Sequence, residues 1–310
     1  MKNTPLISIA LCVYNGEEFL EEQLHTLLNQ TYPNIELVIS DDGSSDNSLN
    51  IIRRYADDQR IKLFVNDRNL GYVKNFEKTI QRCNGEYIAL ADQDDIWDLN
   101  KIEILQKKIG DSVLVYHDSM LIDARNTELG KMSDLLKMYH GSSPFPFLFY
   151  NCISGHSCMF KKSLVEHLGR FNSNFPHDWW MAFVAGNVGK INYVARPLVK
   201  YRQHRQSNTD ILKRRERSNQ NKPKYPEVNL AWLKNCLNFN GKYKKLIARI
   251  IYLLENKNLM NSIRLFCILA PHANELYFLK KKSRLSRLNY LRKMVFYNPY
   301  PNLTLETAIN

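Results

Sequence analysis

Short apolar runs and amphipathic segments alternate along the first 120 residues. The apolar runs are rich in Ile, Leu and Val, as buried β-strands are, and they cover residues 6–13, 35–40, 61–65, 87–91 and 113–116. Between them, apolar residues recur three and four positions apart over residues 17–28, 45–55, 72–83 and 98–109, which predicts helices. Strands joined by such helices pair in parallel, so we predict an α/β fold, a mostly parallel sheet with helices on both faces.

Polar residues follow three of the predicted strands. Tyr14, Asn15 and Gly16 come after the first strand, residues 41–44 after the second, and residues 92–95 after the fourth. In an open parallel sheet, ligands bind beyond the carboxyl ends of the strands. We therefore expect these three segments to converge at one edge and to form a site.

The rest of the chain divides into a less regular middle and a helical end. Residues 209–224 are polar and basic, which is typical of a loop or linker, and apolar residues at helical spacing resume from Leu230. Residues 280–293 combine such spacing with a basic flank. We predict one large domain over residues 1–225, with halves at 1–116 and 117–225, and a basic helical appendage over residues 226–310.

The net charge of +12 conceals a strong asymmetry. Residues 1–120 contain 12 Lys and Arg against 20 Asp and Glu, whereas the rest contains 31 against 11. This imbalance is typical of a chain that meets a polyanion or an anionic membrane, and equally of a solvated basic surface. A nucleic-acid enzyme is disfavoured, because the basic residues lie away from the acidic half.

Composition and apolar runs also bear on the compartment. No apolar stretch is long enough to span a membrane, and the run at 6–13 lacks the flanks of a secretion signal, so we expect a cytoplasmic protein. The six cysteines form no C-x-x-C pair, which argues against a zinc site or a disulfide framework and suits a reducing compartment.

The segment after the fourth strand is the clearest candidate for chemistry. Asp92 and Asp94 are two positions apart, so in an extended segment both carboxylates face one side. Mg²⁺ and Mn²⁺ favour such oxygen ligands together with substrate phosphates. The chain has no glycine-rich phosphate loop after the first strand, so a metal would have to neutralise a nucleotide's phosphates. Acidic residues are also favoured in the first turn of a helix. This alternative explains Asp98 well, but it explains Asp92 and Asp94 poorly.

A second acidic segment follows the second strand. Gly43 to Asp46 suit a turn and a helix cap, which leaves the carboxylates of Asp41 and Asp42 for a base N–H or a ribose hydroxyl.

Six motifs in order make the sequence resemble the inverting glycosyltransferases of family 2, including rhamnosyltransferases of bacterial O-antigen and capsule assembly. They are ISIALCVYNGEEFLEEQL, ELVISDDGSSDNS, NLGYVKNF, GEYIALADQDDIWDLNK, HDWWMAFVA and PLVKYRQHRQSN, spread over about residues 5–208. The resemblance implies a Rossmann-like GT-A fold. It makes residues 1–116 the nucleotide-binding half and 117–225 the acceptor and catalytic half.

The resemblance also implies roles for single residues. Asp178 matches the catalytic base, although His177 stands where the family has Glu. The expected donor-nucleotide contacts are Tyr14, Asn15, Asp41, Asp42, Asp92 and Arg202, and the expected ligands of Mn²⁺ or Mg²⁺ are Asp94, Asp92 and His204. Candidates for the acceptor side are His177, Trp179, Trp180 and His156.

Without the resemblance, the sequence says less about the roles of the residues from Asp178 onward. An Asp-Trp-Trp sequence is commonly a capped helix with buried aromatic residues, and Arg202 and His204 could be surface residues. Asp178 is nevertheless the one acid after residue 120 in an aromatic segment, 175–180, that would desolvate a carboxylate and raise its pKa. A basic pair near an acid-metal site also suits a diphosphate leaving group.

We therefore expect an inverting glycosyltransferase of surface polysaccharide synthesis. By analogy the donor is dTDP-rhamnose, with UDP-linked galactose, glucose or an N-acetylhexosamine as the other choices. The expected acceptor is a lipid-linked or oligosaccharide glycan, and the basic end would touch the inner face of an anionic membrane. An inactive nucleotide-sugar-binding partner and a sugar nucleotidyltransferase are the rival interpretations; the second usually has a basic glycine-rich loop where residues 14–18 are acidic.

Overall fold

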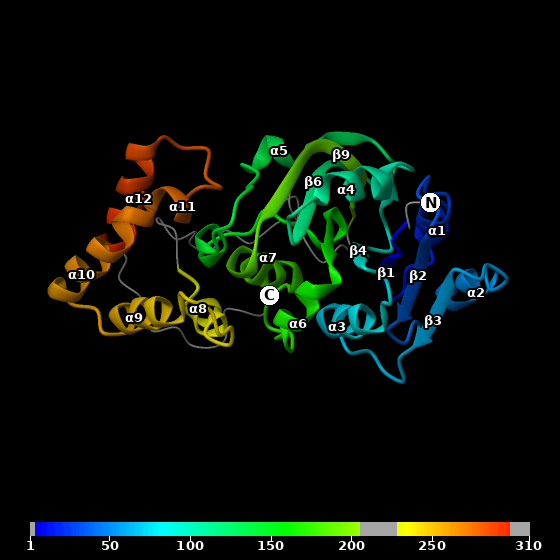
Figure 1. Cartoon of the computed structure of the whole chain (residues 1–310), viewed down its shortest axis with the longest axis horizontal. Helices are drawn as coiled ribbons and strands as arrows, with labels where there is room; N and C mark the ends of the chain where they lie inside the picture. Colours follow the sequence, from blue (N-terminus) through cyan, green and yellow to red (C-terminus); the bar gives the residue numbers. More distant parts are fainter. Residues whose placement is uncertain (1–3, 205–227, 298–310) are drawn as a thin grey trace.

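The computed structural model describes residues 4–204 and 228–297, and Figure 1 shows their arrangement. Within these ranges one sheet holds nine strands: β1 (Ile7–Val13), β2 (Ile35–Asp41), β3 (Ile61–Val65), β4 (Tyr87–Ala91), β5 (Ile96–Trp97), β6 (Leu114–Asp123), β7 (Glu128–Lys131), β8 (Cys158–Lys161) and β9 (Ile191–Gln203). The strand order is β3-β2-β1-β4-β8-β6-β9-β5, with β7 paired to β6. β1 pairs in parallel with β2 and β4, and β2 with β3, which confirms the predicted α/β class.

Helices cover both faces of this sheet, as the alternating pattern predicts. The helices up to residue 204 are α1 (Leu20–Leu28), α2 (Ser48–Arg53), α3 (Tyr72–Arg82), α4 (Lys101–Ile109), α5 (Met132–Leu135), α6 (Val165–Leu168) and α7 (His177–Val188). Ile9 and Leu11 of β1 belong to a core cluster with α1 and α4, whereas Ala10 and Cys12 belong to a second cluster with α3 and α7. β1 is a continuous apolar run because both of its faces are covered.

The far half of the sheet departs from the parallel pattern. β8 lies between β4 and β6 and is antiparallel to both. β6 extends beyond the predicted residues 113–116, and β9, which pairs in parallel with β6, was not predicted as a strand. β9 lacks a clear period because Ala195 and Arg196 are exposed, and Pro197 lies where the register with β6 shifts.

Three predicted helices begin three residues later than expected: α1 at Leu20, α2 at Ser48 and α4 at Lys101. Before α1, the carbonyl of Gly16 accepts the N–H groups of Phe19 and Leu20, so Asn15 does not cap this helix. Asn15 has a φ of +48°, and its side-chain oxygen instead accepts the N–H of Ser45, 2.8 Å away. The link joins the loops after β1 and β2.

Residues 228–297 are mostly helical, as predicted. It forms α8 (Leu230–Cys236), α9 (Lys244–Glu255), α10 (Leu259–Leu269), α11 (Ala273–Leu276) and α12 (Arg284–Tyr297), which lie at the opposite end of the molecule from β3 (Figure 1). None of the helices within the described ranges is both long and apolar enough to cross a bilayer. The linker predicted at residues 209–224 lies outside the described residues.

These C-terminal helices share a core with the sheet domain. One cluster of buried side chains runs from Ala10 of β1 through α7 to Val295 of α12. Trp232 of α8 is fully buried, and its indole stacks on Trp179 of α7 with ring centroids 4.5 Å apart. The described part of the appendage is therefore packed against the helix that carries Asp178.

Candidate active site

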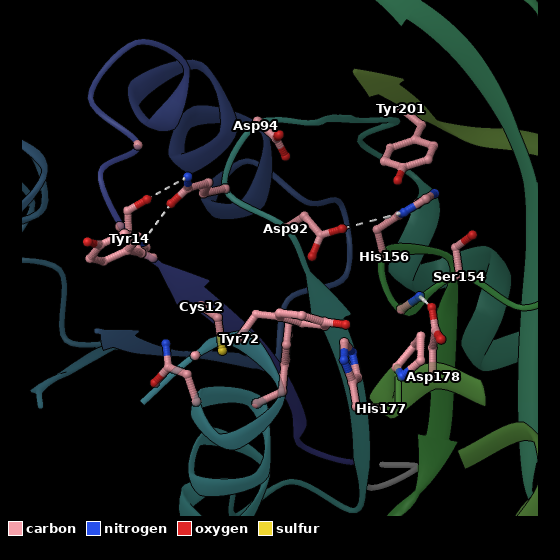
Figure 2. A pocket seen from close by; sticks show the side chains of 18 of the residues that line it. Cys12, Tyr14, Tyr72, Asp92, Asp94, Ser154, His156, His177, Asp178 and Tyr201 are labelled. Atoms are coloured by element: carbon pink, nitrogen blue, oxygen red, sulfur yellow. Dashed lines mark hydrogen bonds and ion pairs between the residues drawn. The ribbon is translucent and has the colours of Figure 1, made fainter. Parts of the chain in front are cut away.

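A cavity of about 1150 Å³ opens at the carboxyl ends of β1 and β4 (Figure 2). Segments after these strands line one side of it. The rest is lined by the start of α3, α5, residues 151–154 with the short 3₁₀ turn Gly155–Ser157, the first turn of α7 and the end of β9. The predicted edge of the sheet therefore coincides with this cavity. Each predicted site residue can be judged by whether it reaches the cavity.

Asp92 and Asp94 both line the cavity, and Gln93 between them fixes the loop after β1. The Gln93 amide accepts the N–H of Tyr14 at 2.8 Å and donates to its carbonyl at 3.0 Å. A Cβ on Gly16 would lie 2.5 Å from the Gln93 side-chain oxygen, so the absence of a side chain there lets Gln93 keep this position. The loops after β1 and β4 are thus held together, and Tyr14 is presented to the cavity.

Asp94 is paired with His204, which follows β9 110 positions later. The imidazole Nε2 of His204 lies 2.7 Å from a carboxylate oxygen of Asp94, and both side chains line the cavity. The sequence predicted these two as metal ligands, and the structure places them side by side. Their role remains a prediction.

Arg202 does not reach the cavity, contrary to its predicted contact with the donor. Its side chain is only 1% exposed, and its guanidinium donates to Glu22 at 2.8 Å and to the carbonyl of Asp94 at 2.7 Å. Its backbone N–H donates to Asp95 at 3.0 Å. Because it is buried and bonded in this way, Arg202 holds the Asp94 backbone in place.

Asp92, Asp95 and His156 form a second group of possible metal ligands. One ligand atom from each lies within 4.8 Å of the others. His156 and Asp95 are fully buried, and Nδ1 of His156 and one carboxylate oxygen of Asp95 have no hydrogen-bond partner. Burial of the imidazole lowers the pKa of His156. Desolvation opposes ionisation of Asp92, but its interaction with His156 nevertheless lowers the pKa of that carboxyl.

The acids after β2 are mostly engaged in local structure. Asp41 is fully buried and does not line the cavity; it accepts the N–H groups of Gly43 and Ser44, so it shapes a turn instead of contacting a donor. Asp42 borders the cavity, but it is 2% exposed and accepts from Leu70 and Gly71. Asp42 therefore positions the loop that leads into α3.

Asp178 lies in the first turn of α7, on the far side of the cavity from Asp94 (Figure 2). It accepts the N–H of Gly155 at 3.2 Å and a side-chain N–H of Asn151 at 3.1 Å. Burial raises the pKa of Asp178 to about 7, and the nearby charge of Asp92 acts in the same direction. A carboxylate with such a pKa can accept a proton near neutral pH.

His177 is an unusual neighbour for this carboxyl. Its ring is 5% exposed, stacks on Phe76 with centroids 4.3 Å apart, and has no hydrogen-bond partner on either nitrogen. Burial lowers the pKa of His177 to about 4, so the ring is neutral near pH 7. Because its ring borders the cavity, a ligand hydroxyl is a suitable partner for an unpaired nitrogen.

The two tryptophans of α7 differ in their surroundings. Trp179 lines the cavity, and its indole donates to the carbonyl of Phe147 at 2.7 Å. Trp180 is 6% exposed, does not line the cavity and donates to the carbonyl of Leu168. The helical spacing turns adjacent residues to different sides. Trp180 is therefore a core residue and not an acceptor contact.

Two residues near the site were not predicted from the sequence. Tyr72, the first residue of α3, is 41% exposed and points into the cavity toward His177 and Asp178 (Figure 2). Lys101 is fully buried, and its ammonium donates to the carbonyl of His156 at 2.6 Å. Tyr72 directly follows the turn from Asn69 to Gly71, and this position could have indicated it as a site residue. Lys101 is a single lysine in a predicted helix, and the sequence around it does not indicate a role.

The side chains around the acidic loop suit a divalent cation. Carboxylates and a neutral imidazole are ligands that Mn²⁺ accepts, and Mg²⁺ shares the preference for oxygen. Asp94 and His204 offer such atoms at the cavity surface. One oxygen of Asp95 and Nδ1 of His156 make no hydrogen bond and belong to fully buried residues, and each lies within 4.8 Å of a carboxylate oxygen of Asp92.

Comparison with known proteins bears on the identity of this site. The model of the family described as glycosyl transferase family 2 matches residues 8–169. An uncharacterised glycosyltransferase of Haemophilus influenzae is 26% identical over 272 residues, which is 83% of this chain and 84% of that protein. TuaG of Bacillus subtilis, a proposed teichuronic acid biosynthesis glycosyltransferase, is 34% identical over 100 residues, 32% of this chain and 40% of TuaG.

Solved structures share the fold at lower identity. S. aureus TarS in complex with UDP-GlcNAc superposes with a TM-score of 0.59 at 14% identity, over 93% of this chain and 90% of that one. The mannosyltransferase PcManGT of Pyrobaculum calidifontis, in complex with GDP-Man and Mn²⁺, gives a TM-score of 0.50 at 17% identity, over 95% and 88%. The fold is that of GT-A glycosyltransferases.

Proposed function

The chain belongs to glycosyl transferase family 2, and on this premise we propose that it transfers a sugar, with inversion, from a nucleotide-diphosphate donor to a glycan hydroxyl. The observation that carries the proposal is the position of Asp178. Its carboxyl, whose pKa is raised to about 7, faces the cavity on the side away from Asp94. An inverting displacement needs a base on the face opposite the leaving group.

Asp178 acts as the base in this proposal. The acceptor oxygen forms a bond to the anomeric carbon while its proton passes to Asp178, and the bond from that carbon to the diphosphate oxygen breaks with its electron pair. The N–H of Gly155 and the amide of Asn151 hold the carboxylate in position. Tyr72 and His177 border the space between Asp178 and Asp92, where the transferred sugar would lie.

Asp94 and His204 hold the metal in this proposal, and Arg202 keeps the Asp94 backbone in position. Mn²⁺ or Mg²⁺, when bound, supplies Lewis-acid stabilisation for the departing diphosphate. Tyr14 and Asn15 border the nucleoside end together with the loop that Asp42 positions, and Asp92 lies between nucleotide and sugar. His156 supports Asp92 from below, and Trp179 offers an aromatic face to the acceptor.

The chemistry of the cavity and the ligands of structural neighbours support a proposal for the substrate class. TarS binds UDP-GlcNAc, and the PcManGT complex holds GDP-Man, so a nucleotide sugar is the proposed donor. We propose dTDP-rhamnose or a UDP-hexose, and a lipid-linked or oligosaccharide acceptor of a bacterial surface polysaccharide. The proposed place of action is the inner face of the cell membrane.

Donor binding with and without metal tests this function. The purified chain should be thermally stabilised by one of dTDP-rhamnose, UDP-glucose, UDP-galactose or UDP-N-acetylglucosamine, and should slowly hydrolyse it, only when Mn²⁺ or Mg²⁺ is present. Stabilisation without hydrolysis or transfer would favour an inactive binding protein. Undiminished activity in excess chelator would reject the metal assignment, and no response to any donor would reject the proposed donors.

A further inference from the structure

α10 has the composition of a buried helix but is buried along only one side. Its sequence, LMNSIRLFCIL, contains one charged residue, Arg264. Leu265 and Leu269 are buried against the neighbouring helices, whereas Leu259, Met260 and Ile263 are 72%, 58% and 43% exposed. Asn261 and Ser262 are also buried, so the uncharged polar side chains of α10 lie on its covered side while several of its large apolar ones face outward. The exposed side of α10 is therefore without a partner among the described residues.

The exposed residues lie together on one side of the helix. Leu259, Ile263 and Cys267 are four positions apart, and Cys267 is also exposed. Phe266 on the same side contacts Phe296 of α12, with ring centroids 5.9 Å apart, and Phe296 is 36% exposed. We call Leu259, Met260, Ile263 and Phe296 the α10 face. Single exposed apolar residues are common, but a contiguous group marks an interaction surface.

The surrounding helices are strongly basic. Residues 228–297 contain 14 Lys and Arg against two acids, Glu255 and Glu275, which accounts for a charge of +12. On α9, the helix packed beside α10, Lys244, Lys245 and Arg249 are all exposed. An apolar helix face among such cations combines the two features by which peripheral proteins bind anionic membranes.

We propose that the α10 face inserts into the surface of an anionic lipid bilayer while the basic residues of α9 and α12 meet the lipid headgroups. The inference deepens the proposed function, because it rests on a lipid-linked acceptor and names the surface that would bring the enzyme to it. None of the described residues that line the cavity comes from α8–α12, so docking leaves the reaction site uncovered by this face.

The charge of the region distinguishes this occupant from a second copy of the chain. A symmetric dimer through the α10 face would bring together two copies of a region, residues 228–297, whose net charge is +12, and like charges repel each other. An anionic leaflet supplies the complementary charge and also an apolar layer for Leu259, Met260 and Ile263. The sequence also predicts membrane contact at residues 280–293. There Leu291 and Arg287 are buried, and Arg287 donates to backbone carbonyls, whereas Leu285 and Leu288 are 82% and 38% exposed. This segment would therefore add to the contact that α10 makes.

Co-sedimentation of the full chain with vesicles tests the proposal. Vesicles of phosphatidylglycerol and phosphatidylcholine in a one-to-two ratio should bind the protein, with affinity falling as salt rises, whereas phosphatidylcholine alone should bind it weakly. The double variant Leu259→Glu/Ile263→Glu should bind the anionic vesicles on the order of tenfold more weakly or worse. Replacing Lys244 and Lys245 by Ala should mainly flatten the salt dependence.

The matched control is Val65→Glu/Leu99→Glu. These residues are exposed to 48% and 42% on the sheet domain, do not line the cavity, and give the same change in net charge. The control should bind like the unmodified chain, and both variants should keep its melting temperature. Equal binding by the two double variants, or no binding by the unmodified chain, overturns the proposal.

Two further measurements separate the possible causes of failure. Light scattering that shows a dimer, made monomeric by Leu259→Glu/Ile263→Glu, would assign the α10 face to self-association and overturn the membrane proposal. Donor hydrolysis by a water-soluble assay should be unchanged in every variant, because α10 is outside the cavity. Loss of vesicle binding with hydrolysis intact therefore bears on this inference, and loss of hydrolysis in the unmodified chain bears on the proposed function.

Discussion

Asp178 and His177 share one helical turn but differ in how their polar atoms are satisfied. Asp178 accepts two hydrogen bonds, whereas neither nitrogen of His177 has a partner. Burial acts on both, and in each case it disfavours the charged form, so it raises the pKa of the acid and lowers that of the histidine. The turn therefore presents a carboxyl that titrates near neutral pH beside an uncharged ring.

Replacement of Asp178 by Asn keeps the shape of the side chain and removes its basicity. We expect turnover to fall on the order of a hundredfold or more, while donor affinity stays close to that of the unmodified enzyme. In the unmodified enzyme, the rate should rise with pH through a midpoint near 7, as the carboxyl ionises. Steady-state kinetics over a pH series and donor titration of the same variant check this. A variant with normal turnover would exclude Asp178 as the base.

The raised pKa of Asp178 should also make the stability of the protein depend on pH. Its folded-state pKa, about 7, is above the ordinary value of 3.8, so the folded state holds a proton that the unfolded state has released between these values. This contribution stabilises at low pH and is lost as pH rises toward 7. Asp178→Asn should therefore raise the melting temperature relative to the unmodified chain more at about pH 8 than at about pH 4. An equal difference at both would contradict the raised pKa.

Asp94 and Asp95 are adjacent, yet we expect opposite outcomes from the same substitution. Asp94 lines the cavity beside His204, so Asp94→Asn should abolish metal-dependent donor binding. Asp95 is fully buried, does not line the cavity, and accepts the N–H of Arg202, which an Asn oxygen can still do. Mn²⁺ titration with and without donor compares the two. Loss of Mn²⁺ binding in Asp95→Asn alone would place the ion with Asp92 and His156.

At the scale of elements, the loops after β1 and β4 act as one unit. The Gln93 amide bonds both backbone groups of Tyr14, and Gly16 leaves room for it. In Gly16→Ala the new methyl group would lie 2.5 Å from the amide oxygen, so Gln93 must move. We expect donor affinity to fall roughly tenfold and stability to fall by about 1–3 kcal/mol. Calorimetric titration and urea unfolding measure the two effects.

The effect of Gly16→Ala needs a control, and other single glycine substitutions do not provide one. In Gly85→Ala the new Cβ would also meet a buried backbone atom, at 2.5 Å. Gly71→Ala meets no atom but has a φ of +80°. The informative comparison is Gly16→Ala/Gln93→Ala, which removes the clash. It should recover part of the stability and none of the affinity, because the bond to Tyr14 is absent in both cases. Full recovery of affinity would mean that Gln93 does not position Tyr14.

The strands in the first half of the sheet could be predicted because the sequence of each one, taken alone, indicates a buried strand. β1 and β4 are apolar runs covered on both faces, and the acids after β4 mark the edge. β9 was not predictable, since its pairing depends on β6, about eighty positions earlier, and its own pattern is interrupted by Pro197. For the same reason, the sequence could indicate Arg202 as a site residue but could not predict its burial. That burial depends on contacts with Glu22 and Asp94, which are distant from Arg202 in the sequence.

At the scale of the whole molecule, the C-terminal helices within the described residues share one hydrophobic core with the sheet domain. Trp232 of α8 is fully buried, stacks on Trp179 and donates to the carbonyl of Phe147 at 3.0 Å. A chain cut near Lys224 would lose this packing, so it is not a suitable test of membrane binding. Point variants on α10 avoid the difficulty.

Trp232→Ala should destabilise the entire protein. We expect a loss of about 3–5 kcal/mol, because the substitution leaves a large cavity beside α7 and an indole hydrogen bond is lost. Since the core cluster is continuous, unfolding should remain a single transition when followed by far-ultraviolet circular dichroism and by tryptophan fluorescence. Trp232→Phe, which keeps an aromatic ring, should cost less. Two separate transitions would show that the helices fold as an independent unit.

The carbonyl oxygen of Phe147 accepts both indole N–H groups, from Trp179 on the cavity wall and from Trp232 behind it. This shared acceptor has a consequence for recombination between related enzymes. A chimera that exchanges the segment after residue 228 but brings no indole at position 232 would remove the ring on which Trp179 stacks, and this wall of the cavity would lose its support. If Trp179 contacts the acceptor as proposed, inheritance of acceptor preference should follow this pair of tryptophans rather than the boundary between the sheet and the last helices.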